Sequence, residues 1–186
     1  MSELASSGQL RAAYLRWALV TVPLVVVLGF VSGALSNSGS ANRWYMLLDK
    51  PWFQPPNWAF PVAWTILYVM LGLSLAMILN ARGARLRGRA IGMFVLAFAL
   101  NLSWSPVFFG LHQPRIALFI IAAMFGTALT TTFLFGRIRT AAAWLLVPYL
   151  VWLCFASLIN FEIIRLNPNA EGLVVEPSGT QIDLIR

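Results

Sequence analysis

The chain has 186 residues, of which 60% are hydrophobic and only 10% are charged, and its mean hydropathy is +0.78. Soluble domains carry about 25% charged residues, so this composition excludes an ordinary soluble domain and predicts an integral membrane protein with lipid as its solvent. The formal charge of +7 does not indicate a nucleic-acid partner, because the cations cluster between apolar runs, as residues that flank membrane spans do.

Five apolar runs follow one another along the chain, each near the length of about 20 residues that crosses a bilayer as a helix. We expect transmembrane helices at about residues 17–35, 59–79, 90–109, 116–135 and 141–164. Their short connectors predict that sequential helices are antiparallel neighbours in one domain, an all-α bundle of five transmembrane helices over residues 1–166. Residues 167–186 would form a carboxyl-terminal tail.

The first run follows Arg11 and Arg16 and contains Pro23. A positive start, an apolar middle and small residues after it also describe a secretory signal peptide. The run is longer than a signal core, and a membrane helix tolerates proline. These features favour a retained span over a cleaved signal.

Residues 37–58, between the first two runs, combine tryptophans with prolines. The prolines forbid a continuous helix and stiffen the backbone, which reduces the entropy lost when the segment closes over a ligand. We expect a lid over the bundle, with its characteristic residues at Trp44, Lys50, Pro51, Pro55 and Pro56.

Arginines predict the orientation, because cytoplasmic connectors carry an excess of cations. The amino-terminal side collects Arg11, Arg16, Arg82, Arg85, Arg87, Arg89, Arg137 and Arg139, and the opposite side has Arg43, Lys50, Arg115 and Arg165, with Arg186 in the tail. In a bacterial cell membrane this asymmetry predicts a cytoplasmic amino terminus and an outward-facing lid.

Ionisable chemistry finds little support in the sequence. No charged residue lies in the middle of a span, where ion-coupled transporters and proton relays need one. His112 lies in a turn without a nearby carboxylate, and Cys154 is the single cysteine, so no intrachain disulfide is possible. We therefore expect no metal site, no required cofactor and no acid–base catalysis.

Aromatic and weakly polar residues recur at helical spacing on three of the runs. They are Trp64 and Tyr68 on the second run, Asn101, Trp104 and Ser105 on the third, and Tyr149, Trp152 and Ala156 on the fifth. An amide is costly against lipid, so the Asn101 face should point into the bundle. If the three faces converge, they form a tryptophan-walled slot that suits a large, flat, apolar ligand with a few polar substituents.

The alternative is that the tryptophans mark the membrane interfaces, where tryptophan and tyrosine are enriched. This interpretation is favoured for residues near the predicted ends of spans, namely Trp17, Trp44, Trp58 and Trp144. Trp104 and Trp152 lie too deep in their runs for it, and Trp64 fits either interpretation.

Gly88 and Gly92 form a small-xxx-small pair at the start of the third run, and Ala97 extends the small surface. Such a stripe lets two helices approach closely. It predicts either a homodimer interface or tight packing within one bundle.

Taken in order, these residues resemble the TspO/MBR family, the tryptophan-rich sensory proteins and translocator proteins that include the peripheral-type benzodiazepine receptor. The similarity covers about residues 15 to 166 and rests on Trp44-Tyr45, Leu48-Asp49-Lys50-Pro51, Pro55-Pro56, Trp64-Thr65-Ile66-Leu67-Tyr68, Asn101, Trp104-Ser105, Trp144-Leu145-Leu146-Val147-Pro148-Tyr149, Trp152 and Asn160. Each match is weak alone, and their order and spacing make the set specific.

The resemblance implies a membrane receptor or carrier, usually dimeric, that binds tetrapyrroles such as protoporphyrin IX and haem, and in some members cholesterol or benzodiazepine-type ligands. It implies pocket positions at Tyr45, Trp64, Asn101, Trp104, Ser105, Trp152 and Ala156. Trp64 and Trp152 match the two tryptophans that the family associates with light-dependent porphyrin breakdown. Two alternatives to a carrier therefore stay open: a photo-oxidative enzyme with these tryptophans as catalytic candidates, and a ligand-sensing regulator or scaffold.

Two departures from the family matter. Animal members carry a cholesterol-recognition pattern at the end of the fifth helix that needs a tyrosine, and Phe161 stands here in its place. The pattern is weak even when complete, so cholesterol is a doubtful natural ligand. The tail after Asn167 extends past the usual family end. By analogy with relatives, an outer-membrane location is an alternative to the cell membrane.

Overall fold

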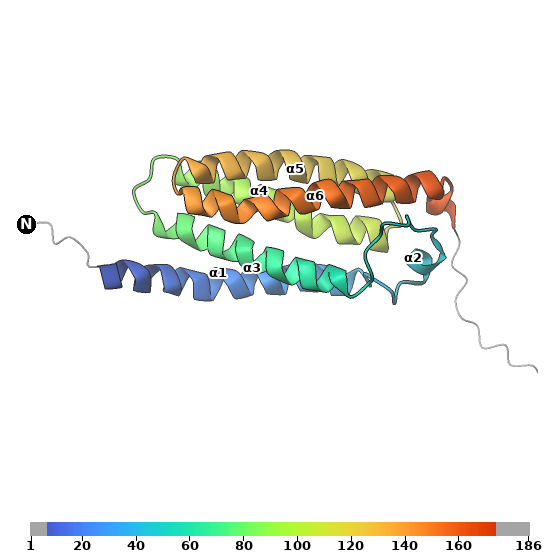
Figure 1. Cartoon of the computed structure of the whole chain (residues 1–186), viewed down its shortest axis with the longest axis horizontal. Helices are drawn as coiled ribbons and strands as arrows, with labels where there is room; N and C mark the ends of the chain where they lie inside the picture. Colours follow the sequence, from blue (N-terminus) through green and yellow to red (C-terminus); the bar gives the residue numbers. More distant parts are fainter. Residues whose placement is uncertain (1–6, 174–186) are drawn as a thin grey trace, which may run out of the picture.

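The computed structural model describes residues 7–173, and all regular secondary structure within them is helical (Figure 1). The elements are α1 (Ser7–Leu35), α2 (Arg43–Leu47), α3 (Ala59–Asn80), α4 (Arg87–Ser105), a π-helical turn (Pro106–Gly110), α5 (Pro114–Gly136), α6 (Thr140–Leu166) and a 3-10 turn (Ala170–Gly172). Five of these helices, all but α2, are long and apolar enough to cross a membrane. The predicted five-helix bundle is confirmed, and the chain is a multi-pass membrane protein.

Lipid offers no partner for backbone N–H and C=O groups, so an apolar run satisfies them internally as an unbroken helix. Pro23 and Pro148 lie inside α1 and α6 without ending them. The helices are longer than the apolar runs: α1 begins at Ser7 and α4 at Arg87, both ahead of the predicted starts. Hydropathy marks only the part of a helix inside the bilayer, whereas leucine, alanine and arginine extend helices beyond it.

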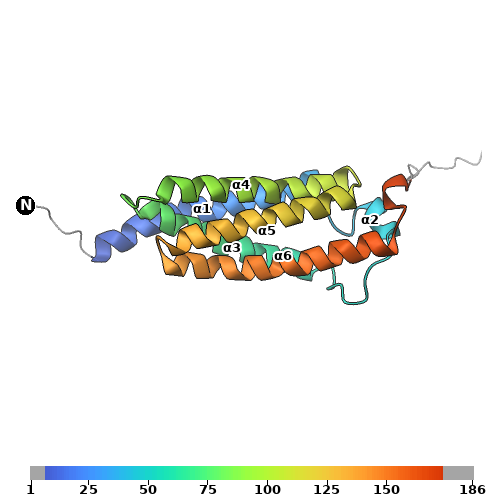
Figure 2. The ribbon, with the colours of Figure 1, turned by 90° about the horizontal axis from the view of Figure 1, so that it is seen from above.

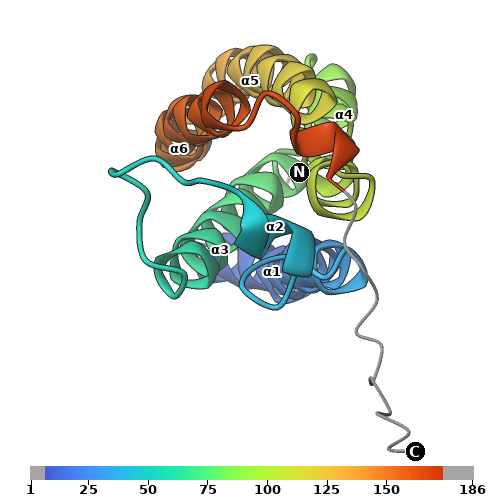
Figure 3. The same ribbon diagram turned by 90° about the vertical axis from the view of Figure 1, so that its right-hand side faces the viewer.

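The five long helices form a closed ring in the order α1, α3, α6, α5, α4, as the end-on view shows (Figure 3). The view from above shows them aligned along one long axis (Figure 2). Most helices that follow one another in sequence are neighbours, as predicted. The pair α3 and α4 is the exception: α1 and α6 flank α3, α1 and α5 flank α4, and α3 and α4 meet across the inside of the ring.

The ring is tightest between α1 and α3. A Cβ atom added at Gly72 would lie 2.6 Å from the Cα atom of Val22, so only glycine permits this approach. Thr21 Oγ1 donates to the carbonyl oxygen of Gly72 at 2.8 Å across the same contact. Ser74 Oγ likewise donates to the carbonyl oxygen of Ala142 at 2.7 Å, which ties α3 to α6. In a lipid environment, such close packing and hydrogen bonding hold helices together.

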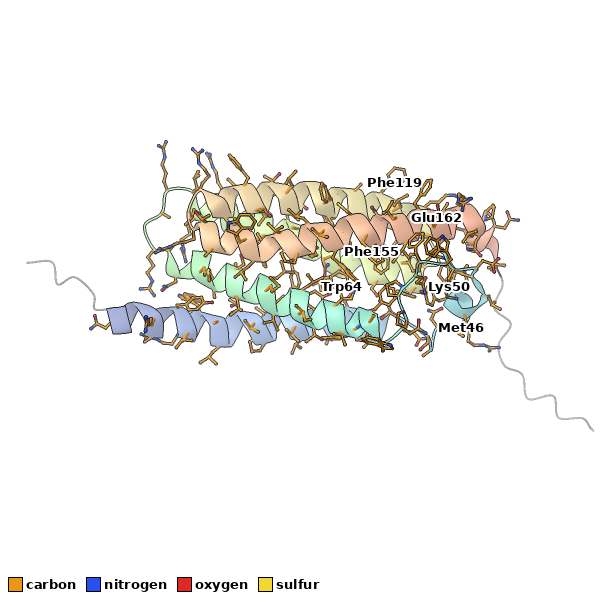
Figure 4. The ribbon with its side chains drawn as sticks, viewed as in Figure 1. Met46, Lys50, Trp64, Phe119, Phe155 and Glu162 are labelled. Atoms are coloured by element: carbon orange, nitrogen blue, oxygen red, sulfur yellow. The ribbon has the colours of Figure 1, made fainter. Side chains whose placement is uncertain are left out.

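The outer surface is apolar, and the two ends of the bundle differ. Phe119 on α5 is 77% exposed and projects away from the bundle (Figure 4), as a lipid-facing side chain does. The arginine-rich connector 81–86 and the α5–α6 turn lie at the end where α1 begins, and α2 lies at the opposite end (Figure 1). The sequence places the same two sets of connectors on opposite sides.

Candidate ligand-binding site

A cavity of about 530 Å³ opens inside the half of the bundle next to the lid. All five long helices and the lid segment contribute to its wall. The residues that line it include Gly29, Phe30, Ser32, Ser38, Tyr45, Asn57, Phe60, Trp64, Tyr68, Asn101, Trp104, Ser105, Phe108, Met124, Trp152, Ala156 and Asn160. None of its described lining residues carries a formal charge.

The structure brings most of the predicted slot residues together around this one cavity. They are Tyr45 from α2, Trp64 and Tyr68 from α3, Asn101, Trp104 and Ser105 from α4, and Trp152 and Ala156 from α6. Tyr149 is the member that does not line the cavity. It is 3% exposed and lies behind Asn101, where it contacts the amide rather than the open space.

Aromatic faces and edges form the walls. The Trp64 ring stacks on Tyr68 with centroids 5.1 Å apart and meets Trp152 edge-on at 6.1 Å. On the facing side, Trp104 stacks on Phe108 at 4.9 Å. Figure 4 shows Trp64 directed from α3 into the space beside α6. Ring contacts of this kind hold the indoles in place as flat, apolar surfaces.

A short hydrogen-bond chain crosses the floor of the cavity. The Tyr68 hydroxyl donates to Asn101 Oδ1 at 3.1 Å, and Asn101 Nδ2 donates to the Tyr149 hydroxyl oxygen at 3.1 Å. The two tyrosines therefore fix the orientation of the amide between α3 and α6. Asn101 keeps one amide hydrogen that no described residue accepts, so the floor offers a single oriented donor.

The lid has a buried first half. Asn42 caps α2 by accepting from the Tyr45 backbone N–H at 2.9 Å, and its Nδ2 donates to the Phe109 carbonyl oxygen at 3.1 Å. This places Tyr45 against the cavity. Burial raises the pKa of the Tyr45 phenol, and a hydrogen bond with Gln54 opposes the rise. The phenol therefore stays neutral at physiological pH.

Lys50 lies over the face of the Tyr45 ring, with Nζ 4.7 Å from the ring centroid. Its ammonium group also donates to the Leu48 carbonyl oxygen at 2.9 Å. Partial burial lowers the pKa of Lys50. The nearby Asp49 carboxylate raises it by a smaller amount. Lys50 itself, like Trp44, Pro51, Pro55 and Pro56, lies outside the cavity lining.

Trp44 departs from the interface position predicted for it. It is 1% exposed and packs in a cluster with Phe108 and Ile163, whereas Trp58 and Trp144 are each 68% exposed, as an interface position requires. Tryptophan enrichment at interfaces is a rule of composition, and it cannot separate a lipid-facing indole from one that a neighbouring segment covers.

The helix α1 contributes a wall that the sequence did not predict. Gly29, Phe30 and Ser32 line the cavity. A Cβ at Gly29 would lie 2.2 Å from the Tyr68 ring, so this glycine makes room for the tyrosine. The signal in the sequence was the Gly29–Gly33 spacing within an apolar run. This spacing predicts a close contact with another helix but not which helix makes it.

The small-residue stripe of α4 divides between two faces. Gly88 and Gly92 are exposed, and a Cβ added at either would meet nothing within 4 Å. Ala97 is instead buried inside the protomer at 5% exposure, so it does not extend that outer surface. Ala97 follows Gly92 by five residues, about 1.4 turns, so it lies on another side of the helix.

Comparison with known proteins identifies the family of this chain. The model of the TspO/MBR family matches residues 20–166, which include the lid and most of every long helix. The chain belongs to the TspO/MBR family. It is 38% identical over 149 residues to the tryptophan-rich protein TspO of Chlorobaculum tepidum, covering 79% of this chain and 93% of that protein.

Two other TspO/MBR proteins show the breadth of the similarity. The tryptophan-rich sensory protein of Cereibacter sphaeroides is 37% identical over 140 residues, covering 74% of this chain and 87% of that protein. The human translocator protein is 33% identical over 147 residues, covering 78% of this chain and 87% of that protein. The resemblance drawn from the sequence is thereby confirmed at the level of the family.

Proposed function

We propose that this TspO/MBR protein binds tetrapyrroles such as protoporphyrin IX and haem, and that it acts as their receptor or carrier in the membrane. The observation that carries the proposal is the uncharged cavity of about 530 Å³ walled by Trp64, Trp104 and Trp152. Its volume lies within the range of about 300–1,000 Å³ typical of small-molecule sites. Indole faces suit a planar aromatic ring system.

Polar groups at the cavity support a ligand that carries hydrogen-bond acceptors. The indole Nε1 atoms of Trp104 and Trp152 are buried without a partner among the described residues. A buried donor left unpaired costs about 1–3 kcal/mol, which a ligand acceptor in reach would recover. Lys50, next to Tyr45, is the cation placed to attract ligand carboxylates toward the lid.

The proposal is tested by titrating the purified protein with protoporphyrin IX and following tryptophan fluorescence. Trp152→Ala and Trp64→Ala each remove one wall, and the loss of an aromatic contact of about 0.5–1.5 kcal/mol plus buried area predicts at least a tenfold weaker affinity. Trp144→Ala is the matched control, because Trp144 is 68% exposed on the outer face of α6. Unchanged affinity in both wall variants would refute the assignment of the cavity.

We also infer that two copies pair through the outer face of α4. Gly88 and Gly92 are open there, so a second helix can approach the backbone closely. Gly92→Leu should shift the protein from dimer to monomer in native mass spectrometry, while Gly126→Leu on the exposed face of α5 should not. A dimer that persists in Gly92→Leu would exclude this face.

The cationic end of the bundle supports an amino terminus on the cytoplasmic side of a bacterial cell membrane. Of the carboxylates in residues 7–173, Asp49, Glu162 and Glu171 all lie toward the lid end, so the arginine-rich end carries no described acidic residue. Reporter fusions in the connector 81–86 should report the cytoplasm and fusions in the lid the opposite side. The reverse pattern would overturn this orientation.

A further inference from the structure

The chain beyond α6 turns back onto the lid. Asn167 Oδ1 accepts from the Asp49 backbone N–H at 2.8 Å, and Asn167 Nδ2 donates to the Asp49 carbonyl oxygen at 2.8 Å. One side chain therefore satisfies both backbone groups of a residue 118 positions away in sequence. The match with the TspO/MBR family ends at residue 166, just before this contact begins.

A second contact lies one turn further on. Trp44 Nε1 donates to the Ala170 carbonyl oxygen at 2.8 Å. The indole is also stacked on His112, with centroids 4.5 Å apart, and meets Phe108 edge-on at 5.6 Å. Ala170 is 2% exposed, so segment 167–172 covers the indole and closes the apolar cluster of Trp44, Phe108 and Ile163 from outside.

The same segment is anchored to the rigid bundle. Arg115 at the start of α5 donates from Nη2 to the Pro168 carbonyl oxygen at 2.8 Å, and its Nη1 lies 3.0 Å from Glu171 Oε2. Segment 167–172 therefore bridges a fixed helix end and the lid.

These contacts hold only the first half of the lid. Asn42 fixes the start of α2 to the π-helical turn that follows α4, and Asp49 is held just after the end of α2. Tyr45, between the two, lines the cavity. The second half is free of this restraint, and Trp52 there is 95% exposed. Because both ends of α2 are fixed, the backbone of Tyr45 cannot move away from the cavity unless one of the two attachments breaks.

We propose that segment 167–172 is a clamp that positions Tyr45 against the cavity and sets the rate at which ligand leaves it. Asn167 and Trp44 are positioning residues in this device, because neither lines the cavity. The inference rests on the proposed ligand-binding function, and it adds a role for a segment outside the part matched to the family.

A purely structural role for Asn167 has to be separated from the clamp, because Asn167 Nδ2 also donates to the Ile163 carbonyl oxygen at 2.8 Å and so caps α6. Two variants each remove one of the two contacts between segment 167–172 and the lid. Asn167→Ala removes the side-chain bonds to both Asp49 and Ile163. Trp44→Phe keeps an aromatic ring in place and removes the donor to Ala170, together with the part of the indole packing that the smaller ring cannot fill.

The experiment measures the dissociation rate of protoporphyrin IX from the full-length protein by stopped-flow fluorescence. Each variant should release the ligand about three- to tenfold faster, the effect of losing one or two hydrogen bonds that hold the closed lid. Glu162→Gln is the control: Glu162 pairs with Arg165 on α6, and no contact joins it to the lid among the described residues. Its rate should equal that of the wild type.

Backbone hydrogen exchange of residues 43–49 in the ligand-free protein provides a readout independent of ligand. Exchange there should accelerate in both variants while exchange in the middle of α6 stays unchanged. If the wild type does not bind protoporphyrin IX, the proposed function fails, and this exchange still tests the clamp. The clamp would be refuted if residues 43–49 of Trp44→Phe exchanged at the wild-type rate. It would also be refuted if faster exchange in Asn167→Ala were confined to the end of α6.

Discussion

Replacing Gly72 by alanine should force α1 and α3 apart. The added Cβ would lie 2.6 Å from the Val22 Cα atom and 3.0 Å from its Cγ2 atom, well inside the carbon–carbon contact distance of about 3.5–4.0 Å. A main-chain atom cannot rotate away, so the helices must separate by about 1 Å. That movement lengthens the bond from Thr21 Oγ1 to the Gly72 carbonyl oxygen, which is now 2.8 Å.

The expected magnitude follows from these contacts. Overpacking costs about 1–3 kcal/mol, and a hydrogen bond between membrane helices contributes about 0.6 kcal/mol. The better helix propensity of alanine returns up to about 1 kcal/mol. We therefore expect Gly72→Ala to lower the free energy of unfolding by about 0.6–2.6 kcal/mol.

Reversible unfolding in mixed detergent micelles, followed by far-UV circular dichroism, measures this difference. Gly126→Ala is the control, because a Cβ there meets nothing within 4 Å and only helix propensity changes. The control should unfold at the same or a higher detergent fraction than the wild type. Equal stability of Gly72→Ala and Gly126→Ala would show that the close α1–α3 contact does not exist in the membrane protein.

Three further outcomes are expected. Gly29→Ala should leave the fold intact and weaken protoporphyrin binding in the same titration, because the new Cβ, 2.2 Å from the Tyr68 ring, displaces that ring from Asn101. Tyr149→Phe removes the acceptor of Asn101 Nδ2 and should destabilise the bundle by about 1 kcal/mol in the unfolding assay, with a smaller effect on binding than Asn101→Ala. Burial lowers the pKa of His112, so the folded protein binds fewer protons than the unfolded chain. The stability of the protein should therefore fall as pH is lowered below about 6.5. The unfolding midpoint of His112→Gln should lack this pH dependence.

The sequence was sufficient for the membrane class and for most of the cavity wall. Helical periodicity correctly put Trp64, Asn101 and Trp152 on inward faces, because an amide or a stack of indoles deep in a span has no favourable place in lipid. It also grouped Tyr149 with them, although Tyr149 lies behind Asn101. Residues three or four apart lie on the same face of a helix, so periodicity predicts which side a residue occupies. It does not separate a residue that lines the cavity from one that packs behind it.

What the sequence could not supply is the order of the helices around the ring. Short connectors predict that α3 and α4 are neighbours in the ring. Instead, α1 and α6 flank α3 on its two sides. The contribution of Gly29 and the coverage of Trp44 by Ala170 both depend on that order. Glycine and tryptophan are compatible with many environments, so their positions become informative only when the facing residue is known.

The arrangement of polar groups explains why the cavity is suited to an apolar, planar ligand. Thr21, Ser32 and Ser74 each donate to a main-chain carbonyl oxygen on a neighbouring helix, so their hydroxyl groups are used in holding the bundle together. Asn101 is held from two sides by tyrosine hydroxyl groups and still has a donor to offer. The proposed ligand would therefore gain most of its binding energy from the indole walls, and its orientation from the amide, the unpaired indole N–H groups and the cation beside the lid. That balance favours a large aromatic ring system with its polar substituents confined to its edge.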